Sequence, residues 1–282
     1  MTTQNTDTVA EAARFLRSHR DRLTPADAGL PRSGRRRRPG LRREEVAHLA
    51  GLSLEYYNRI ERGNLSGVSD AVLAGLTDAL RLTSSETVYL SALTHAQSGH
   101  TDGAAVSTRL RPHILQFLDA IDPPAWVMNH VFDVLAANRM AKAVHEEMFT
   151  STCQPPNPVR FAFLDPDADR AALDPTVHQA RLAALVHAAY ARHSADPAFA
   201  ALICDLIAQS ETFRSYWDRY DVGAGTSGAM FLRHRLVGPM TLDFEVLAFP
   251  SDPGLVLNVQ TAAPGTPTAT ALARLATMLD PA

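Results

Sequence analysis

Lysine is almost absent from this sequence, since Lys142 is the only one among 27 basic residues. Cysteine is nearly as scarce: Cys153 and Cys204 are too few for a disulfide framework, which favours a reducing compartment. The start of the sequence lacks the basic and apolar regions of a secretory signal. No apolar run approaches the ~20 residues that a membrane-spanning helix needs. We therefore expect a cytoplasmic protein with no membrane partner.

The two halves of the chain differ in the sign of their net charge, although the net charge of the whole is only −3. Residues 1–100 carry 14 Arg and 11 acidic residues, whereas residues 101–282 carry 13 basic and 19 acidic residues. A basic front and an acidic rear are typical of a nucleic-acid-binding module followed by a module with another task. The length favours two domains. We predict a domain at 1–98, a linker at 99–107 and a second domain at 108–282.

Residues 41–63 show the clearest local pattern, which predicts two short helices joined by a tight turn. Val46 and Leu49 recur at helical spacing, and Gly51 can end the first helix because it enters a left-handed turn cheaply. Ser53 can cap the second helix. Tyr57 and Ile60 are expected to face inward.

The other side chains of this second helix are polar or basic and are expected to face outward. This stretch resembles the helix-turn-helix of phage-repressor-type regulators (the xenobiotic-response-element family). The matching segments are Glu44-Glu45-Val46-Ala47, Gly51-Leu52-Ser53 and Arg59-Ile60-Glu61-Arg62-Gly63. The resemblance implies that the second helix enters a DNA major groove. The alternative is a plain helical hairpin within an all-α domain.

A basic loop precedes this motif, with seven Arg between residues 32 and 43. Arginine suits phosphate contacts because its planar fork pairs two oxygens at once. A run of charge can also be only a solvated surface, and a loop of this kind can reach a minor groove. A long basic loop here resembles the MmyB-like subgroup of these regulators. The residues expected to contact DNA are Arg35, Arg36, Arg37, Arg38, Arg42, Arg43, Ser53, Glu55, Tyr56, Asn58, Arg59 and Arg62.

Three further helices complete the predicted front domain. A helix is expected over 8–23 from its apolar spacing. Ser69 can cap a helix that runs to Leu80, and Thr83 with Glu86 forms a capping box for a helix that ends near Gln97. The front domain is therefore predicted to be an all-α five-helix domain.

The rear half mixes strand and helix patterns. Strands are expected at 126–128, 131–135, 230–237, 240–249 and 255–259. Helices are expected at 110–121, 138–148, 174–193, twice within 197–220, and at 269–279. The fold class is thus α+β, with a PAS-like rear domain that has an antiparallel sheet and helices. This order resembles the ligand-binding domain of MmyB-like regulators.

The rear half shows no recognisable nucleophile set, zinc pattern or phosphate-binding glycine loop. We therefore expect no enzyme, no metal and no cofactor. A PAS-like sheet can instead enclose an apolar pocket with a few polar groups. Plain core packing is the alternative for each candidate. The pocket candidates are Trp126, Met128, Phe132, Asn138, Phe161, Phe163, Phe213, Arg214, Trp217, Phe231, His234 and Phe244.

The resemblance implies a small apolar, fatty-acid-like effector, and Arg214 is expected to pair with its carboxylate. The whole chain is then predicted to be a homodimeric transcription regulator that binds a palindromic operator in double-stranded DNA. Three alternatives stay open. One is a redox-sensing regulator that uses the thiols of Cys153 and Cys204, and another is a regulator controlled by a protein partner. The third is a haem or flavin sensor or a small-molecule-modifying enzyme.

Overall fold

The computed structural model describes residues 2–30, 40–98, 110–193, 196–223 and 225–279. The chain forms two compact units. The first consists of Met1–Asp102, Ala184–Pro197 and Trp217–Ala224, and the second of Gly103–Ala183, Ala198–Tyr216 and Gly225–Ala282. The predicted phosphate contacts of residues 35–38 lie outside the described residues.

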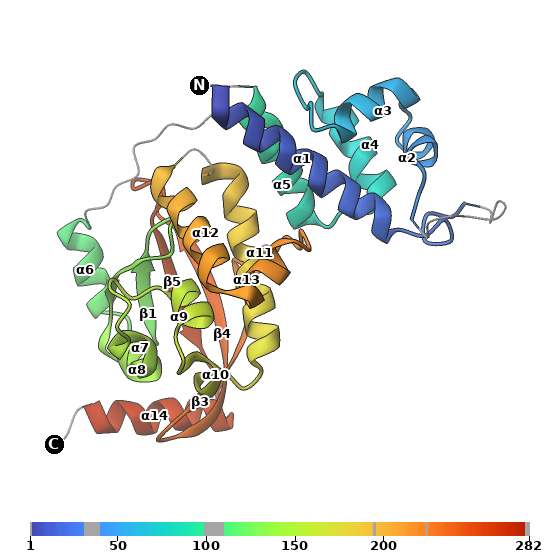
Figure 1. Cartoon of the computed structure of the whole chain (residues 1–282). Helices are drawn as coiled ribbons and strands as arrows, with labels where there is room; N and C mark the ends of the chain where they lie inside the picture. The colour runs from blue at the N-terminus through green and yellow to red at the C-terminus, as the bar shows by residue number, and fades with distance from the viewer. Residues whose placement is uncertain (1, 31–39, 99–109, 194–195, 224, 280–282) are drawn as a thin grey trace. The chain divides into compact units, whose positions relative to one another are not determined.

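Five helices of the first unit come from the front of the chain. They are α1 (Thr2–Arg22), α2 (Arg43–Leu49), α3 (Leu54–Glu61), α4 (Asp70–Leu80) and α5 (Ser84–Gln97) (Figure 1). The hydroxyls of Ser53, Ser69 and Thr83 each accept a hydrogen bond from the backbone amide three residues on, which confirms three predicted starts. Helix α1 begins six residues before the expected Thr8, because its first turns are polar and carry no apolar period.

The core of the first unit is formed by side chains at helical spacing. Phe15, Leu16, Tyr57, Ile60 and Leu76 are all fully buried. The end of α3 approaches α1 so closely that a Cβ on Gly63 would lie 1.8 Å from the Val9 carbonyl oxygen. Only glycine fits there, and its φ of +90° is also a conformation that glycine adopts readily.

Two segments from far along the chain complete this core. The second half of α11 (Pro175–His193) contributes His187, whose ring stacks on Trp217 with centroids 3.9 Å apart. The Tyr89 hydroxyl donates to Glu11 Oε1 at 2.6 Å, and His187 Nδ1 lies 3.5 Å from the same oxygen. Burial raises the pKa of Glu11 and lowers the pKa of His187 to about 3.

The second unit contains one antiparallel sheet with the strand order β2-β1-β5-β4-β3. Its strands are β1 (Ala125–Met128), β2 (Val134–Ala137), β3 (Ser227–His234), β4 (Gly238–Ala248) and β5 (Val256–Thr261). A helical front followed by a five-stranded antiparallel sheet with helices confirms the predicted α+β class.

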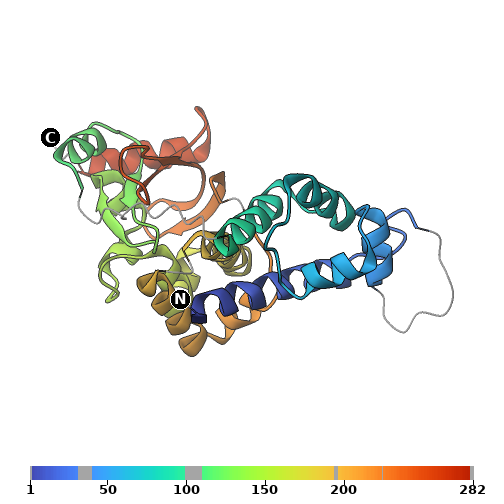
Figure 2. The same cartoon turned by 90° about the horizontal axis from the view of Figure 1, so that it is seen from above.

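The sheet has a helix layer on each side (Figures 1 and 2). Helix α6 (Pro112–Asp119) packs Ile114 and Leu118 against one face, which includes Val127 and Leu257. Helices α7 (Arg139–Val144) and α14 (Pro267–Leu279) pack against the other face, which we call the inner face. The remaining helices are α8 (Glu146–Thr150), α9 (Pro158–Leu164), α10 (Ala168–Ala171), α12 (Pro197–Gln209) and α13 (Glu211–Trp217).

Two predicted elements of the rear half were placed wrongly. The second strand begins at Val134 rather than Val131, because residues 129–133 form a turn in which Phe132 has a φ of +65°. The helix expected over 138–148 is broken at His145, which has φ −114° and ψ 36°. The His145 ring bonds to Gln260 on the sheet, so a tertiary contact overrides the local helical pattern.

Candidate functional site

Helix α3 has one buried and one exposed side. Tyr57, Ile60 and Glu61 are buried, as their spacing requires. The side chains that face outward, together with those at the start of α2, form a continuous group that we call the α2–α3 surface. Its members are Arg42, Arg43, Leu54, Glu55, Tyr56, Asn58, Arg59 and Arg62, all of them exposed or half-buried.

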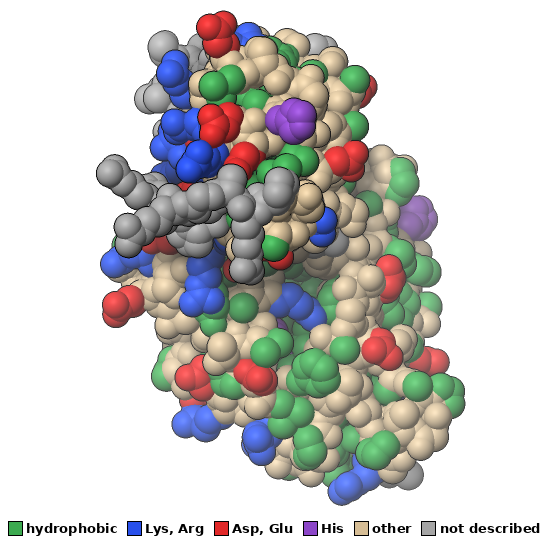
Figure 3. Space-filling model, turned by 90° about the vertical axis from the view of Figure 1, so that its right-hand side faces the viewer, with side chains coloured by type: hydrophobic (Ala, Val, Ile, Leu, Met, Phe, Trp, Pro, Cys, Tyr) green, Lys and Arg blue, Asp and Glu red, His purple; other side chains and the backbone are tan. Residues whose placement is uncertain are grey.

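A hollow of about 450 Å³ lies in this surface. Its lining consists of Arg20, Arg42, Arg43, Glu44, Leu54 and Asn58. In the upper part of the view in Figure 3, several Lys and Arg side chains lie close together, with acidic side chains among them. The guanidinium groups of Arg42 and Arg43 are about half exposed at this hollow, so they can donate to phosphate oxygens in the paired geometry that arginine favours.

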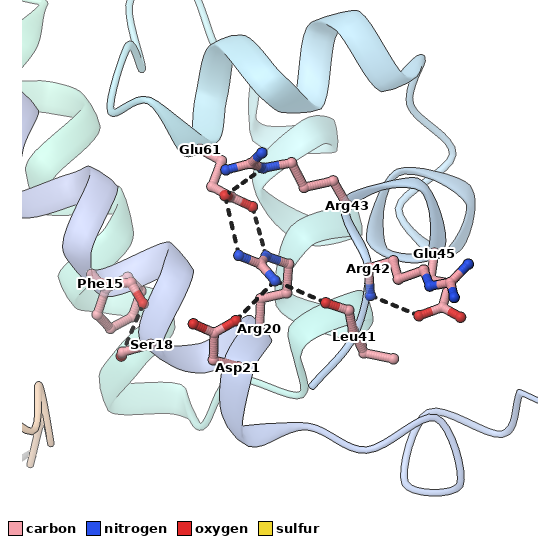
Figure 4. Close-up of polar contacts among 9 residues, drawn as sticks. All are labelled: Phe15, Ser18, Arg20, Asp21, Leu41, Arg42, Arg43, Glu45 and Glu61. Atoms are coloured by element: carbon pink, nitrogen blue, oxygen red, sulfur yellow. Dashed lines mark hydrogen bonds and ion pairs between the residues drawn. The ribbon is translucent and has the colours of Figure 1, made fainter. Parts of the chain in front are cut away.

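One buried carboxylate organises two of these arginines (Figure 4). Glu61 Oε2 accepts from Arg20 Nε at 2.8 Å, and Glu61 Oε1 accepts from Arg43 Nε at 2.7 Å. The Glu61 side chain is 1% exposed, whereas the Arg43 side chain is 53% exposed. Glu61 therefore holds the inner end of the Arg43 guanidinium and leaves its other nitrogens toward solvent.

The pKa of Glu61 reports the strength of this pairing. Burial by itself raises the pKa of a carboxyl, but the hydrogen bonds from Arg20 and Arg43 outweigh burial and lower the pKa below its usual value. The Glu61 carboxylate is therefore ionised and paired at neutral pH. Arg20 also donates from Nη1 to the Leu41 carbonyl at 2.9 Å, which ties α1 to the start of α2.

The structure places the other predicted DNA-contacting side chains on α3 or at its ends. The Arg59 guanidinium lies over the Tyr56 ring, 4.8 Å from its centroid, and is exposed. The Ser53 hydroxyl is used by the helix cap. Sequence reasoning missed Arg20 and Glu61, which lie 41 residues apart. The one local indication of this ion pair was the position of Arg20 in the last turn of α1.

The inner face of the sheet brings together four of the predicted pocket residues. The strand registers put Trp126 and Met128 of β1, His234 of β3 and Phe244 of β4 on this one face. All four are buried. Gln260 of β5 pairs with Phe244 and adds a polar group that sequence reasoning missed.

A polar cluster lies within this otherwise apolar layer. His145 Nε2 and Gln260 Oε1 are 2.7 Å apart, and the His145 ring meets Trp126 edge-on at 4.9 Å. Burial lowers the pKa of His145 to about 4, so this imidazole is neutral at pH 7. The Trp126 Nε1–H is buried and has no hydrogen-bond partner among the described residues. A buried donor without a partner is rare in folded proteins.

The remaining predicted pocket residues lie elsewhere. Trp217 belongs to the first unit. Phe231 points to the opposite face of the sheet and is 44% exposed. Arg214 is exposed and donates to the Ile207 carbonyl.

The four other aromatic candidates are buried or half-buried and lie in helices or a turn rather than in the strands of the sheet. Phe163 and Phe213 pack edge-on at 5.0 Å. Phe132 lies in the β1–β2 turn with its ring 6.4 Å from that of Phe199, and Phe161 is buried in α9. These contacts are those of ordinary core packing.

Asn138 is fully occupied by the chain itself. Its Nδ2 donates to the carbonyls of Ile121 and Pro123, both at 2.7 Å, while its Oδ1 accepts from the amides of Ala125 and Ala141. The side chain thus caps α7 and anchors the connection between α6 and β1. It has no capacity left for a ligand.

Asn138 also forms part of the wall of a mostly apolar groove of about 680 Å³. The groove lies between the α6–β1 connection, the start of α7, the end of β5 and α14. The other lining residues are Asp119, Ile121, Asp122, Pro123, Pro124, Arg139, Met140, Thr261, Ala262, Ala269, Leu272, Ala273 and Ala276.

Neither metal ligands nor a reactive thiol stands out in the described part of the chain. No group of three or more His, Cys, Asp or Glu side chains there could hold a metal ion. Both cysteines are free thiols, and burial raises the pKa of Cys153. No helix within those residues is long and apolar enough to cross a membrane.

The family model for the MmyB-like transcription regulator ligand binding domain matches residues 110–275, which is more than half of the chain. No curated protein matches the sequence. The match covers the β-sheet with its helices, and it leaves the α2–α3 surface outside its limits.

Proposed function

Because the chain belongs to the MmyB-like transcription regulators, whose ligand-binding domain it carries at residues 110–275, we propose that its α2–α3 surface binds operator DNA. In this proposal helix α3 enters the major groove and α2 supports it. The protein acts as a homodimer on a palindromic operator with half-sites about one helical turn apart.

The division of α3 into a buried and an exposed side carries this proposal. The buried residues fix the helix to the core, while Glu55, Asn58 and Arg59 remain available to base edges. Arg42 and Arg43 lie beside them at a hollow suited to an anion. Residues 35–38 supply further phosphate contacts in this proposal, because four successive arginines directly precede this surface in the sequence.

We further propose that the second unit binds a small apolar effector with a carboxylate at the inner face of the sheet. The inner face is lined by Trp126, Met128 and Phe244, and its polar groups lie close together. Binding of the effector shifts the dimer between a conformation that binds the operator and one that does not. The shift equals the difference in the affinity of the effector for these two conformations.

Substitution of Arg59 tests the proposed contact with bases. Arg59→Ala is expected to reduce discrimination between the operator and a single-base-pair variant by roughly 1–3 kcal/mol, the value of one bidentate contact. Replacing Arg35–Arg38 with alanine is expected to weaken binding to both sequences equally and to flatten the dependence on salt. Gel-shift titration at several salt concentrations measures both effects.

Arg17→Ala is the matched control, because Arg17 is an exposed arginine on α1 outside the α2–α3 surface. It should leave affinity and discrimination unchanged. An equal, sequence-independent loss from Arg59→Ala and from the loop variant would contradict the proposed division of roles. No shift with any genomic fragment at modest salt would contradict DNA binding itself.

The structure gives no support to thiol sensing. A reactive cysteine needs a lowered pKa, whereas burial raises the pKa of Cys153 and outweighs the opposing effect of the nearby Arg160. We expect a Cys153→Ser, Cys204→Ser double variant to keep its full response to the effector, measured as the change in operator affinity. Loss of the response with DNA binding intact would restore the redox alternative.

A further inference from the structure

Arg181 of α11 carries a positive charge over the inner face of the sheet without a matching negative charge. Its guanidinium lies 4.2 Å from the centroid of the Phe244 ring, and its Nη1 donates to the Ala229 carbonyl at 2.8 Å. Among the described residues, no carboxylate forms an ion pair with Arg181. A guanidinium has five N–H donors, so most of its hydrogen-bonding capacity remains available.

Three other arginines of the second unit have a carboxylate partner: Arg111 pairs with Asp252, Arg160 with Asp205 and Arg235 with Glu146. Arg214, Arg233 and Arg274 form no ion pair with a described residue but are exposed, so water can solvate their charge. Arg181 is half-buried, and burial lowers its pKa, so it is the arginine for which an absent counter-charge costs most.

The surroundings of Arg181 are otherwise neutral and contain a second unused donor. Phe244 pairs across the sheet with Gln260, Gln260 bonds to His145, and His145 packs against Trp126. The buried Trp126 Nε1–H therefore belongs to the same continuous layer as Arg181. The Arg181 guanidinium and the Trp126 indole are both hydrogen-bond donors, and neither has a side-chain acceptor among the described residues. The complementary molecule carries an anionic, hydrogen-bond-accepting group on an apolar body.

We propose that Arg181 is the residue that selects the anionic head group of the effector, with the apolar part of that molecule lying along the inner face of the sheet. This inference rests on the proposed ligand-binding function of the second unit. It replaces the sequence-based assignment of this role to Arg214, whose guanidinium is exposed and bonded to the Ile207 carbonyl.

The test compares dodecanoate with dodecanol, two probes of equal chain length that differ in the charge of the head group. Titration calorimetry on the full chain, below the micellar concentration, is expected to show tighter binding of dodecanoate. Arg181→Gln is expected to weaken dodecanoate binding roughly 10- to 100-fold, as for the loss of a charge-assisted hydrogen bond, and to leave dodecanol binding unchanged. Arg181→Lys keeps the charge and should lose less.

Two further variants locate the effect. Arg214→Gln should bind both probes as the unmodified chain does. Ala273→Phe fills the groove beside α14 and should also leave binding unchanged, because the proposed site is the inner face. Retained dodecanol binding and an unchanged melting temperature show that Arg181→Gln has folded.

Several results would overturn the proposal. Unchanged preference for dodecanoate in Arg181→Gln would show that another group selects the head, and equal loss of both probes would show that Arg181 only supports the fold. Loss of binding in Ala273→Phe alone would move the site to the groove. These three results would contradict the role of Arg181 but not the proposal that the second unit binds an apolar ligand. If neither probe binds the unmodified chain, both proposals are contradicted.

Discussion

Glu61→Gln is expected to destabilise the first unit by about 3 kcal/mol, because it leaves the mostly buried Arg20 guanidinium without its carboxylate. Removing one partner of a buried ion pair typically costs 3–5 kcal/mol. The lower end applies here, since Asp21 lies 2.8 Å from Arg20 and can compensate in part. Urea unfolding followed by circular dichroism measures the change.

The same carboxylate predicts a dependence of stability on pH. The folded pKa of Glu61 is lower than its usual value of 4.5, so folding favours the ionised form. The stabilisation is therefore complete above the usual pKa and is lost as the pH falls through the folded pKa. Glu61→Gln should flatten the acid limb of the stability profile between these two values.

Two matched variants show whether the loss of stability in Glu61→Gln comes from the buried ion pair or merely from the loss of a charge. Glu55→Gln removes an exposed carboxylate from the same helix and should change stability by no more than about 0.5 kcal/mol. Arg43→Gln should cost less than about 1 kcal/mol, because more than half of the Arg43 side chain is exposed. If Glu61→Gln proved as mild as Glu55→Gln, the buried pairing would not stabilise the unit.

Asn138→Ala is expected to destabilise the second unit by about 3 kcal/mol. The substitution removes four hydrogen bonds and leaves the carbonyls of Ile121 and Pro123 and two backbone amides without partners. Each unsatisfied buried group costs about 1–3 kcal/mol, although water in the adjacent groove can reach some of them. Urea unfolding of the full chain in a Trp217→Phe background, where Trp126 is the remaining tryptophan and its fluorescence reports on this unit, measures the loss.

Asn138→Asp distinguishes the two halves of this network, since it keeps the acceptor for the two amides and loses both donors. We expect a loss of similar size, because an aspartate oxygen would face the two carbonyl oxygens. Gln116→Ala, at an exposed position on α6, is the control and should be nearly neutral. Near-neutral behaviour of Asn138→Ala would show that these four bonds contribute little.

Local signals predicted most of the helices and strands. Ser53, Ser69 and Thr83 lie where their caps are needed, and the turn glycine Gly51 has the expected positive φ of +67°. These features depend on residues within four positions of one another. The period of two in β4 likewise placed Phe244 on a buried face.

Contacts between distant residues could not be predicted in this way. The break in the helix at His145 depends on Gln260, 115 residues away. The orientation of the Arg43 guanidinium depends on its hydrogen bond to Glu61 in another helix. The position of Arg181 over Phe244 of the sheet likewise depends on the packing of α11, 63 residues away from that ring in the sequence. Neither periodicity nor composition contains that information.

The completion of the first unit by residues 184–197 and 217–224 has a consequence for how such regulators diversify. A recombination event that joined a foreign effector domain to residues 1–98 would remove His187 from beside Glu11 and Tyr89, together with the Trp217 ring that stacks on His187. The hybrid would then carry an uncovered carboxylate at a former protein interior. We therefore expect module exchange to succeed where the donor preserves these side chains, or where the junctions retain both short segments with the amino-terminal helices.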